Sequence, residues 1–555
     1  MAIPFNKLAF SMPIGAAVLM VANQLLGLAA PYLVKVAIDD GIGAGDMELL
    51  WMVGLAGLFI YAAIALTSYG GNWLAVKAGE EIWEELRNQV FAHVQDLPLK
   101  ELKGRQVGEL VAWVYGDTYQ IKQVVTAAMP SAINLVVSVG GAGVILLILA
   151  PQLVFLALLP IPIGIVVLRW HRKFVRPLSR ERMDRYGKFY SILHEGIAGA
   201  EDVRVLGAES EIASQVRERG RELKEVDLSL ARYRAWMAPG ADFGISLVLL
   251  GTLVAGGHLA ITGTLSVGVV VVFYFYVSRC LGPIRGIPSM VFAWHSAQAA
   301  RERIDELLAM QNEVIEPETP RAALPGPLEV EFRELSFSYG PGGEALDGFG
   351  LDVSPGASIA ILGPSGVGKS TTARLLMRLM DGTSGQLRLG GENLREWSLG
   401  ELRRRIGYVG QEVFLFGGTL RANLVLGLKE DPEQERIQEV LETAGLKDLV
   451  EKDRGGLEME IGPRGANLSG GQKKRVALAR ALLRSPDLLI VDQMATDLEE
   501  SLNERIFRRL RHEGMTLLYF GHRVPAGLDP SEVYWMERGQ VRPYLPGQFE
   551  QAAPL

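Results

Sequence analysis

Long apolar runs dominate the first half of this 555-residue chain, and charged segments separate them. Soluble domains rarely repeat apolar runs of about 20 residues, the length at which a helix crosses the hydrocarbon of a membrane. The pattern therefore predicts six membrane-spanning helices, at residues 8–38, 49–76, 124–150, 153–170, 239–261 and 266–294. The last run is interrupted by Arg279, Pro283, Arg285 and Pro288, so we expect its end to leave the lipid.

The charge of the connections between these runs predicts how the helices are oriented. Residues 39–48 carry four acidic side chains and neither lysine nor arginine, whereas the long connections 77–123 and 169–234 contain many basic residues. Lysine and arginine accumulate on the cytoplasmic side of membrane proteins. We therefore expect a multi-pass protein of the inner (plasma) membrane, with both termini and both long connections in the cytoplasm.

Both long connections mix charged and apolar residues at helical spacing. This spacing predicts that the membrane helices continue into the cytoplasm before the chain reverses. Glycines mark candidate reversals at 104–107 and 116–117 in the first connection, and at 196–199 and Gly207 in the second. Such reversals could contact a cytoplasmic domain or form plain solvated hairpins, and the residue pattern leaves both open.

Polar residues inside the predicted spans are candidates for lining a cavity, because polar groups are expensive in lipid. They are Asn23, Gln24, Lys35, Asn72, Asn134, Asp242 and His258, and the sequence assigns none of them as a substrate contact. The formal net charge of -7 gives no indication of a nucleic-acid partner. The one cysteine, Cys280, excludes an intrachain disulfide.

The second half of the chain has a different pattern. Residues 313–327 are rich in proline and charge, which predicts a linker between a membrane domain, 1–312, and a second domain, 328–555. In the second domain, strand-like runs such as 328–332 and 335–338 alternate with helical stretches. This alternation is typical of an α/β nucleotide-binding domain.

A phosphate-binding loop is the clearest chemical signal in the second domain. An apolar strand, 358–362, leads into it, and a helical run, 372–380, follows it. The glycines allow backbone N–H groups to face nucleotide phosphates, the lysine adds a positive charge, and the following hydroxyl is placed for Mg²⁺. The loop consists of Gly363, Pro364, Ser365, Gly366, Val367, Gly368, Lys369, Ser370 and Thr371.

Further motifs follow in order. Tyr339 offers a flat ring on which adenine could stack, and an apolar strand, 488–492, ends in Asp492, a carboxylate suited to Mg²⁺. Another strand, 516–520, ends just before His522. Two more segments stand between these residues: Gln411 after an apolar strand, and Leu468, Ser469, Gly470, Gly471 and Gln472 before a predicted helix, 473–483.

Together these motifs make nearly the whole chain resemble an ATP-binding cassette (ABC) exporter half-transporter. The resemblance implies a six-helix all-α transmembrane domain fused to an α/β P-loop cassette, with ATP and Mg²⁺ as its cofactors. It implies that Tyr339 stacks on adenine, that Lys369, Ser370 and Thr371 hold phosphate and Mg²⁺, and that His522 contacts the γ-phosphate. Gln411 and Asp492 are implied near the metal. The signature Leu468–Gln472 is implied to close over the ATP of a second cassette.

The chain departs from the family pattern after Asp492. Gln493 stands where the family usually has a glutamate that polarises the attacking water, and an amide cannot accept a proton. Losing a general base typically costs about 10²–10⁴ in rate, and residues 494–499 differ from the family as well. We therefore expect an ATP-binding but hydrolysis-deficient subunit, paired with a second half-transporter in a heterodimer.

Two other interpretations remain open at this stage. Gln493 could be an engineered, ATP-trapping replacement in a homodimeric exporter, or the chain could be a mainly regulatory, ATP-gated subunit. The expected cargo is an amphiphile in contact with membrane lipid. The sequence does not choose among drugs, lipids and peptides.

Overall fold

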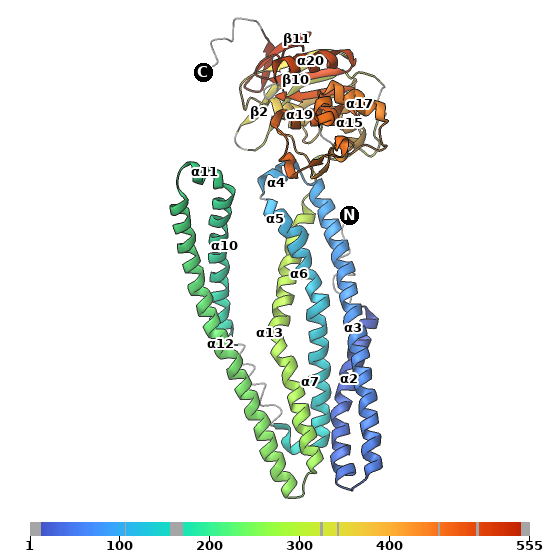
Figure 1. Ribbon diagram of the computed structural model, residues 1–555, viewed down its shortest axis with the longest axis vertical. Coiled ribbons are helices and arrows are strands. Elements are labelled where there is room, and N and C mark those ends of the chain that lie inside the picture. The colour runs from blue at the N-terminus through green and yellow to red at the C-terminus, as the bar shows by residue number, and fades with distance from the viewer. Residues whose placement is uncertain are drawn as a thin grey trace. The chain divides into compact units, whose positions relative to one another are not determined.

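The computed structural model describes residues 13–105, 107–155, 169, 171–321, 326–340, 343–452, 455–494 and 499–544. It divides into two compact units, one formed by Met1–Gln95 with Val107–Ala309, and the other by Asp96–Gln106 with Met310–Leu555. The described part of the first unit is helical, whereas the second unit contains the strands β1 to β12 (Figure 1). The segment Asp96–Gln106, which lies in the first of the two long connections, therefore belongs to the second unit.

Four described helical segments are long and apolar enough to cross a membrane: Ile14–Ile42, Met47–Asp96, Val107–Leu149 and Asp242–Ile261. They contain α2 (Ile14–Val36), α3 (Met47–Asp96), α7 (Met129–Leu149) and the end of α12 (Glu209–Ile261). The predicted span 153–170 lies almost entirely outside the described residues. The last predicted span belongs to α13 (Val267–Ala309), whose apolar part, Val267–Cys280, is shorter than we expected.

The helices continue beyond their apolar parts, as predicted from the helical spacing of charged and apolar residues in the two long connections. α3 has 50 residues and α12 has 53, so each is roughly 75–80 Å long, more than twice the hydrocarbon thickness of about 30 Å. α10 (Arg176–Ala198) packs along α12, and α11 (Ala200–Val205) joins them. The predicted reversals at 196–199 and Gly207 are correct, and Gly207 has a positive φ of 62°.

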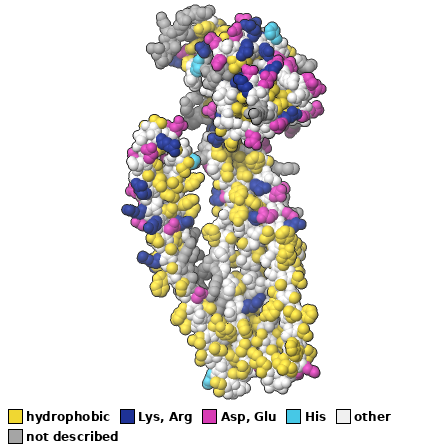
Figure 2. All heavy atoms as spheres, viewed as in Figure 1, with side chains coloured by type: hydrophobic (Ala, Val, Ile, Leu, Met, Phe, Trp, Pro, Cys, Tyr) yellow, Lys and Arg dark blue, Asp and Glu magenta, His cyan; other side chains and the backbone are white. Residues whose placement is uncertain are grey.

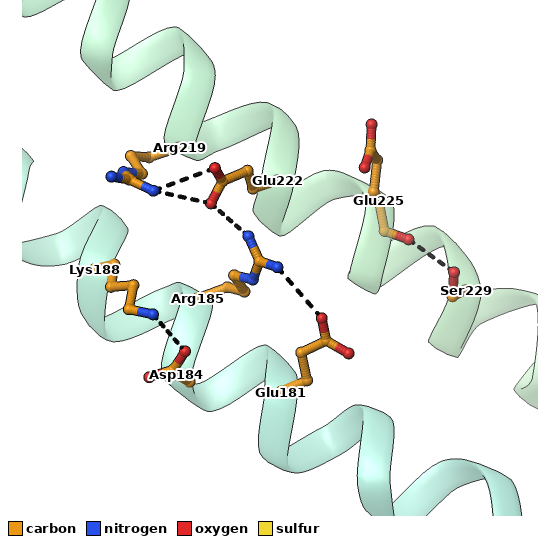
Figure 3. Close-up of polar contacts among 8 residues, drawn as sticks. All are labelled: Glu181, Asp184, Arg185, Lys188, Arg219, Glu222, Glu225 and Ser229. Atoms are coloured by element: carbon orange, nitrogen blue, oxygen red, sulfur yellow. Dashed lines mark hydrogen bonds and ion pairs between the residues drawn. The ribbon is translucent and has the colours of Figure 1, made fainter.

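Ion pairs connect α10 to the charged half of α12 (Figure 3). The carboxylate of Glu222 accepts hydrogen bonds from Arg185 at 2.6 Å and from Arg219 at 3.2 Å. The hydrogen bond from Arg185 lowers the pKa of Glu222. Because these groups are partly exposed to solvent, each pair contributes little stability by itself, and the network mainly fixes the register of the two helices.

The first long connection reverses near 104–107, but the second predicted reversal in it, 116–117, is wrong. α3 ends at Asp96, the short α4 (Leu99–Gly104) follows, and α5 (Val107–Val111) begins the return. Gly116 and Asp117 lie inside η2 (Ala112–Asp117), within the helical segment that continues to Leu149. There the Asp117 carboxylate accepts hydrogen bonds of 2.9 and 2.5 Å from Arg303 of α13, so the polar pair joins two helices instead of marking a turn.

The second unit contains two main sheets. A six-stranded sheet has the order β12-β11-β3-β10-β9-β6 and a four-stranded antiparallel sheet the order β2-β1-β4-β5. The predicted strands 328–332 and 335–338 are one strand, β1, which bends at irregularities in its pairing with β2. The strands are β1 (Val330–Ser338), β2 (Glu344–Val353), β3 (Ser358–Leu362), β4 (Ser384–Leu389), β5 (Glu392–Asn393), β6 (Ile406–Val409), β9 (Leu488–Asp492), β10 (Thr516–Gly521), β11 (Glu532–Glu537) and β12 (Gln540–Pro543).

Both faces of the parallel strands are buried, which explains their continuous apolar sequences. On one face, Ile359 and Ile361 of β3 pack with the antiparallel sheet and with α14 (Lys369–Leu376). On the other face, Leu489 and Val491 of β9 pack in a cluster that includes residues of α17 (Gln434–Thr443), α19 (Gly470–Leu482) and α20 (Glu500–His512). This layered core holds the carboxyl ends of the strands in fixed positions.

Much of the expected linker, 313–327, is attached to the second unit. The Glu316 carboxylate accepts hydrogen bonds from the Ser398 hydroxyl and the Leu399 N–H at the start of α15 (Leu399–Arg405). Arg321 forms ion pairs with Glu392 and Glu396. Composition predicts a linker here, but it does not reveal these contacts, which fix the described residues of the segment to the domain that follows.

Candidate nucleotide-binding site

Four parallel strands end at one edge of the six-stranded sheet. The register pairs Leu362 at the end of β3 with Gly521 at the end of β10, Phe520 with Asp492 of β9, and Val409 of β6 with Val491. The phosphate-binding loop, His522, Gln493 and Gln411 each follow one of these ends within two residues. Loops at the carboxyl ends of parallel strands are the usual place for a ligand in α/β sheets, so the structure brings these predicted residues together.

The loop between β3 and α14 depends on glycine at specific positions. Gly366 and Gly368 have φ values of 82° and 111°, in the region that favours glycine. A Cβ at Gly368 would lie 2.6 Å from the carbonyl oxygen of Ala345 and 2.8 Å from Cε of Met536. The helix begins at Lys369 rather than at residue 372 as predicted, so the N–H groups of its first turn border the loop.

Lys369 is folded onto its own loop. Its Nζ donates hydrogen bonds to the carbonyl oxygens of Gly363 at 2.7 Å and Pro364 at 2.6 Å. Burial lowers the pKa of Lys369, and the negative charge of Asp492 opposes this shift. The ammonium is therefore held inside the loop, where its charge can meet a phosphate.

Asp492 is fully buried at the end of β9, next to Ser370. Its Oδ2 accepts a hydrogen bond of 2.6 Å from the Ser370 hydroxyl, and its Oδ1 has no hydrogen-bond partner among the described residues. Burial raises the pKa of Asp492, opposed by the Ser370 hydrogen bond and by nearby positive charges that include Lys369. A carboxylate oxygen with free acceptor capacity beside a hydroxyl fits Mg²⁺, which typically takes one or two protein carboxylates and completes its shell with phosphate oxygens and water.

Gln493 is held through its main chain by two different elements. Its N–H donates to the carbonyl oxygen of Phe520 in β10 at 2.8 Å, and its carbonyl oxygen accepts from Nζ of Lys474 in α19 at 2.6 Å. Its φ of 53° is unusual for a residue with a side chain. Of the altered segment 494–499, Met494 is buried and residues 495–498 lie outside the described residues.

Lys474 is a buried charged residue that none of the sequence motifs indicated. It is only 4% exposed, and its positive charge counteracts the raised pKa of Asp492. Lys474 stands three, four and seven residues before Ala477, Leu478 and Ala481, so all four lie on the same face of α19. The three apolar residues are buried in the same core. That periodicity was available in the sequence and indicates a lysine on the apolar face of its helix.

Tyr339 lies beside the helix that follows the loop. Its hydroxyl is 3.1 Å from the Thr371 hydroxyl and accepts a hydrogen bond of 3.0 Å from Arg374. The ring packs edge-on against Phe337 and is 40% exposed. Gln411 and His522 are exposed at the same sheet edge.

The signature Leu468–Gln472 is built as a helix start. Ser469 caps α19 by accepting from the Gln472 N–H, and the Gln472 side chain accepts from the Ser469 N–H, which together form a capping box. Within the described residues, no hydrogen bond joins this signature to the phosphate-binding loop of the same chain. Ser469 and Gly470 are exposed, so the first helical turn is open to another molecule.

Comparison with known proteins agrees with this architecture. The sequence profile of the ABC transporter transmembrane region matches residues 14–284, and the profile described as ABC transporter matches residues 346–496. A multidrug resistance ABC transporter ATP-binding and permease protein of Lactococcus lactis is 27% identical over 528 residues, which cover 94% of this chain and 88% of that protein. An ATP-dependent lipid A-core flippase of Pectobacterium atrosepticum is 26% identical over 535 residues, which cover 95% of this chain and 90% of that protein.

A solved structure shares the fold across almost the whole length. The structure of a bacterial Atm1-family ABC exporter with ATP bound has a TM-score of 0.80 and 23% sequence identity, and the match covers 97% of this chain and 96% of that one. At this identity the match concerns the fold alone. The chain belongs to the ABC transporter family, as a polypeptide that carries a transmembrane region and an ATP-binding cassette and has the fold of an ABC exporter.

Proposed function

We propose that this chain is one subunit of a heterodimeric exporter of the inner (plasma) membrane, which uses ATP to move an amphiphile out of the cytoplasm. The family and the names of the relatives, a multidrug transporter and a lipid flippase, support export of an amphiphilic drug or lipid. The basic connections support a cytoplasmic N-terminus and cassette. The observation that carries the asymmetric part of the proposal is Gln493, directly after the buried Asp492.

The geometry of the sheet edge supports a proposed position for ATP. ATP phosphates would lie on the N–H groups of Gly363–Thr371 and the Lys369 ammonium, and the adenine on the Tyr339 ring. Ser370 and Asp492 would hold Mg²⁺, with Gln411 and His522 on the side of the γ-phosphate. The metal supplies positive charge that neutralises the charge developing on the phosphates. The unpartnered Oδ1 of Asp492 supports this assignment.

Hydrolysis at this site is proposed to be slow. The Gln493 amide can orient a water molecule but cannot take its proton, which removes the general base from the expected position. The main-chain hydrogen bonds of Gln493 hold its backbone at the end of β9, so the proposed defect would lie in the chemistry of its side chain. The partner would supply a glutamate at its own site, and the exposed first turn of α19 here, including Ser469, would close over that competent ATP.

Copurification tests the proposed partnership. A tagged chain, expressed from its native locus and purified in mild detergent, should yield a second half-transporter in a one-to-one ratio, with a glutamate after its own strand-ending aspartate. A stable and active homodimer of this chain alone would contradict the heterodimer and favour an engineered Gln493. ATP-dependent dimerisation without substrate-stimulated hydrolysis would instead favour a regulatory subunit.

A further inference from the structure

A polar cavity of about 380 Å³ lies among α2, α7 and α13 in the helical unit. Arg279 lines it together with Gln24, Ser131 and Asn134. Arg279 belongs to the apolar part of α13, roughly 18 Å along the helix axis from its start. Gln24 and Asn134 also lie in segments that are long and apolar enough to cross a membrane. Ionisable residues within spans usually have a functional role because their burial in lipid is costly.

The charge of Arg279 is not neutralised by a carboxylate within the described part of the chain. Its Nη2 donates one long hydrogen bond, 3.4 Å, to Oε1 of Gln24, and its buried Nε has no partner there. The ionisable groups that interact with it are two tyrosines and a cysteine, Tyr61, Tyr276 and Cys280, and none of them is a carboxylate. A guanidinium has five N–H donors in a fork that matches a carboxylate or phosphate, and only the Nη2 of Arg279 has a hydrogen-bond partner among the described residues.

The position of the guanidinium is fixed by its surroundings. Gly27 provides the space that it occupies, because a Cβ at residue 27 would lie 1.9 Å from Nη2 and 2.7 Å from Cζ of Arg279. The Oε1 of Gln24 accepts a hydrogen bond of 3.0 Å from Ser138 as well as the bond from Arg279, which holds the amide in place. A second cavity of about 210 Å³ shares Gln24 and Asn134 and extends toward α3.

We propose that Arg279 forms an anion site that selects amphiphiles with a carboxylate or phosphate headgroup. This inference rests on the proposed export function and specifies its substrate class. The headgroup binds the guanidinium fork in the cavity, while the apolar tail lies along the hydrophobic surface of the helical unit (Figure 2). The same chemistry fits a transported acid and an anionic membrane lipid, and the two sources are separated below.

A matched pair of probes tests the proposal: dansyl-labelled undecanoic acid and its methyl ester, which differ in headgroup charge. Binding is measured by fluorescence titration of the purified transporter in phosphatidylcholine nanodiscs. We expect the acid to bind about tenfold or more tightly than the ester, since a charge-assisted hydrogen bond typically contributes this much. Arg279→Gln should reduce this ratio to near one while leaving ester binding unchanged, which also shows that the variant is folded. Arg279→Lys should keep part of the preference.

Two controls separate the site from general effects. Arg301→Gln removes an arginine of the same helix that pairs with Asp305, and it should keep the preference. Gly27→Ala should displace the guanidinium and weaken acid binding, whereas Gly54→Ala, where a Cβ would meet no atom within 4 Å, should not. An equal affinity for acid and ester in the unmodified transporter, or a preference that survives Arg279→Gln, would overturn the anion site.

The source of the anion is tested in the same system. If phosphatidylglycerol in the nanodisc displaces the acid through Arg279, the anion site stands and membrane lipid is its occupant. If it does not, and the acid stimulates ATP hydrolysis more than the ester does, the acid is the transported class. If the transporter moved the acid and the ester equally well in the presence of ATP, the anion site would be refuted but the proposed export of amphiphiles would stand. Movement of neither probe would instead count against the proposed export of amphiphiles.

Discussion

Replacing Gln493 by glutamate changes the charge at the proposed catalytic position with almost no change in shape. Two hydrogen bonds that hold Gln493, to Phe520 and from Lys474, use main-chain atoms that glutamate has as well. The substitution should therefore leave the sheet edge and ATP binding intact. Any change in turnover then reports on the chemistry of residue 493.

The expected gain can be bounded. A positioned general base contributes about 10²–10⁴ in rate, or about 2.7–5.4 kcal/mol of activation free energy. We expect Gln493→Glu to raise turnover less than tenfold, which corresponds to lowering the activation free energy by less than about 1.4 kcal/mol. The Lys474 ammonium, 2.6 Å from the main-chain oxygen of residue 493, should lower the basicity of a new carboxylate. The neighbouring residues 494–499 also differ from the family pattern, and a base is effective only when the remaining geometry is in place.

The assay is ATP turnover of the purified complex at saturating Mg-ATP, with the corresponding glutamate of the partner neutralised so that only this site is measured. Gln434→Glu, at the exposed first residue of α17, serves as a control for an added negative charge. ATP binding is measured in parallel to establish that the site is intact. A hundredfold rise with Gln493→Glu would refute the reasoning and identify Gln493 as an ATP-trapping replacement.

Three further predictions concern the same site. In the complex, Ser469→Arg should nearly abolish steady-state ATPase because a bulky cation would occupy the phosphate position at the competent site, whereas Lys369→Ala should leave a larger share of turnover; equal losses would contradict the asymmetry. Gly368→Ala should weaken binding of a fluorescent ATP analogue more than tenfold and lower the unfolding free energy by about 1–3 kcal/mol through backbone strain and close contacts. Gly391 also has a positive φ, 78°, but no atom lies within 4 Å of an added Cβ, so Gly391→Ala should preserve nucleotide binding. If Gly391→Ala weakened nucleotide binding as well, the close contacts at Gly368 would not be the cause of the weaker binding in Gly368→Ala. Asp492→Asn should keep an acceptor for Ser370 but abolish the effect of Mg²⁺ on nucleotide affinity, measured with and without a chelator; an unchanged Mg²⁺ effect would exclude Asp492 as the metal ligand.

Several elements could be predicted from sequence because their signals are local. The strands Ser358–Leu362 and Leu488–Asp492 match their predicted bounds, since continuous apolar runs next to a glycine-rich loop or a terminal carboxylate have few other interpretations. The helix after the loop is correct in type, but it begins at Lys369 because the positive φ of Gly368 ends the loop there. The apolar runs of the first half and the alternation of strand-like and helical stretches in the second half likewise predicted a helical membrane domain followed by an α/β cassette.

The periodicity of each element and the chemistry of each motif can be read from the sequence, because backbone hydrogen bonding and apolar burial repeat over a few residues. The tertiary structure alone decided which distant groups meet. It placed Ser370 on Asp492, 122 residues away, and Arg279 near Gln24, 255 residues away. It also showed that Asp117 joins two helices through Arg303 instead of marking a turn. Such contacts depend on packing between elements, and the free energy of a buried charge is set by those neighbours rather than by its position in the chain.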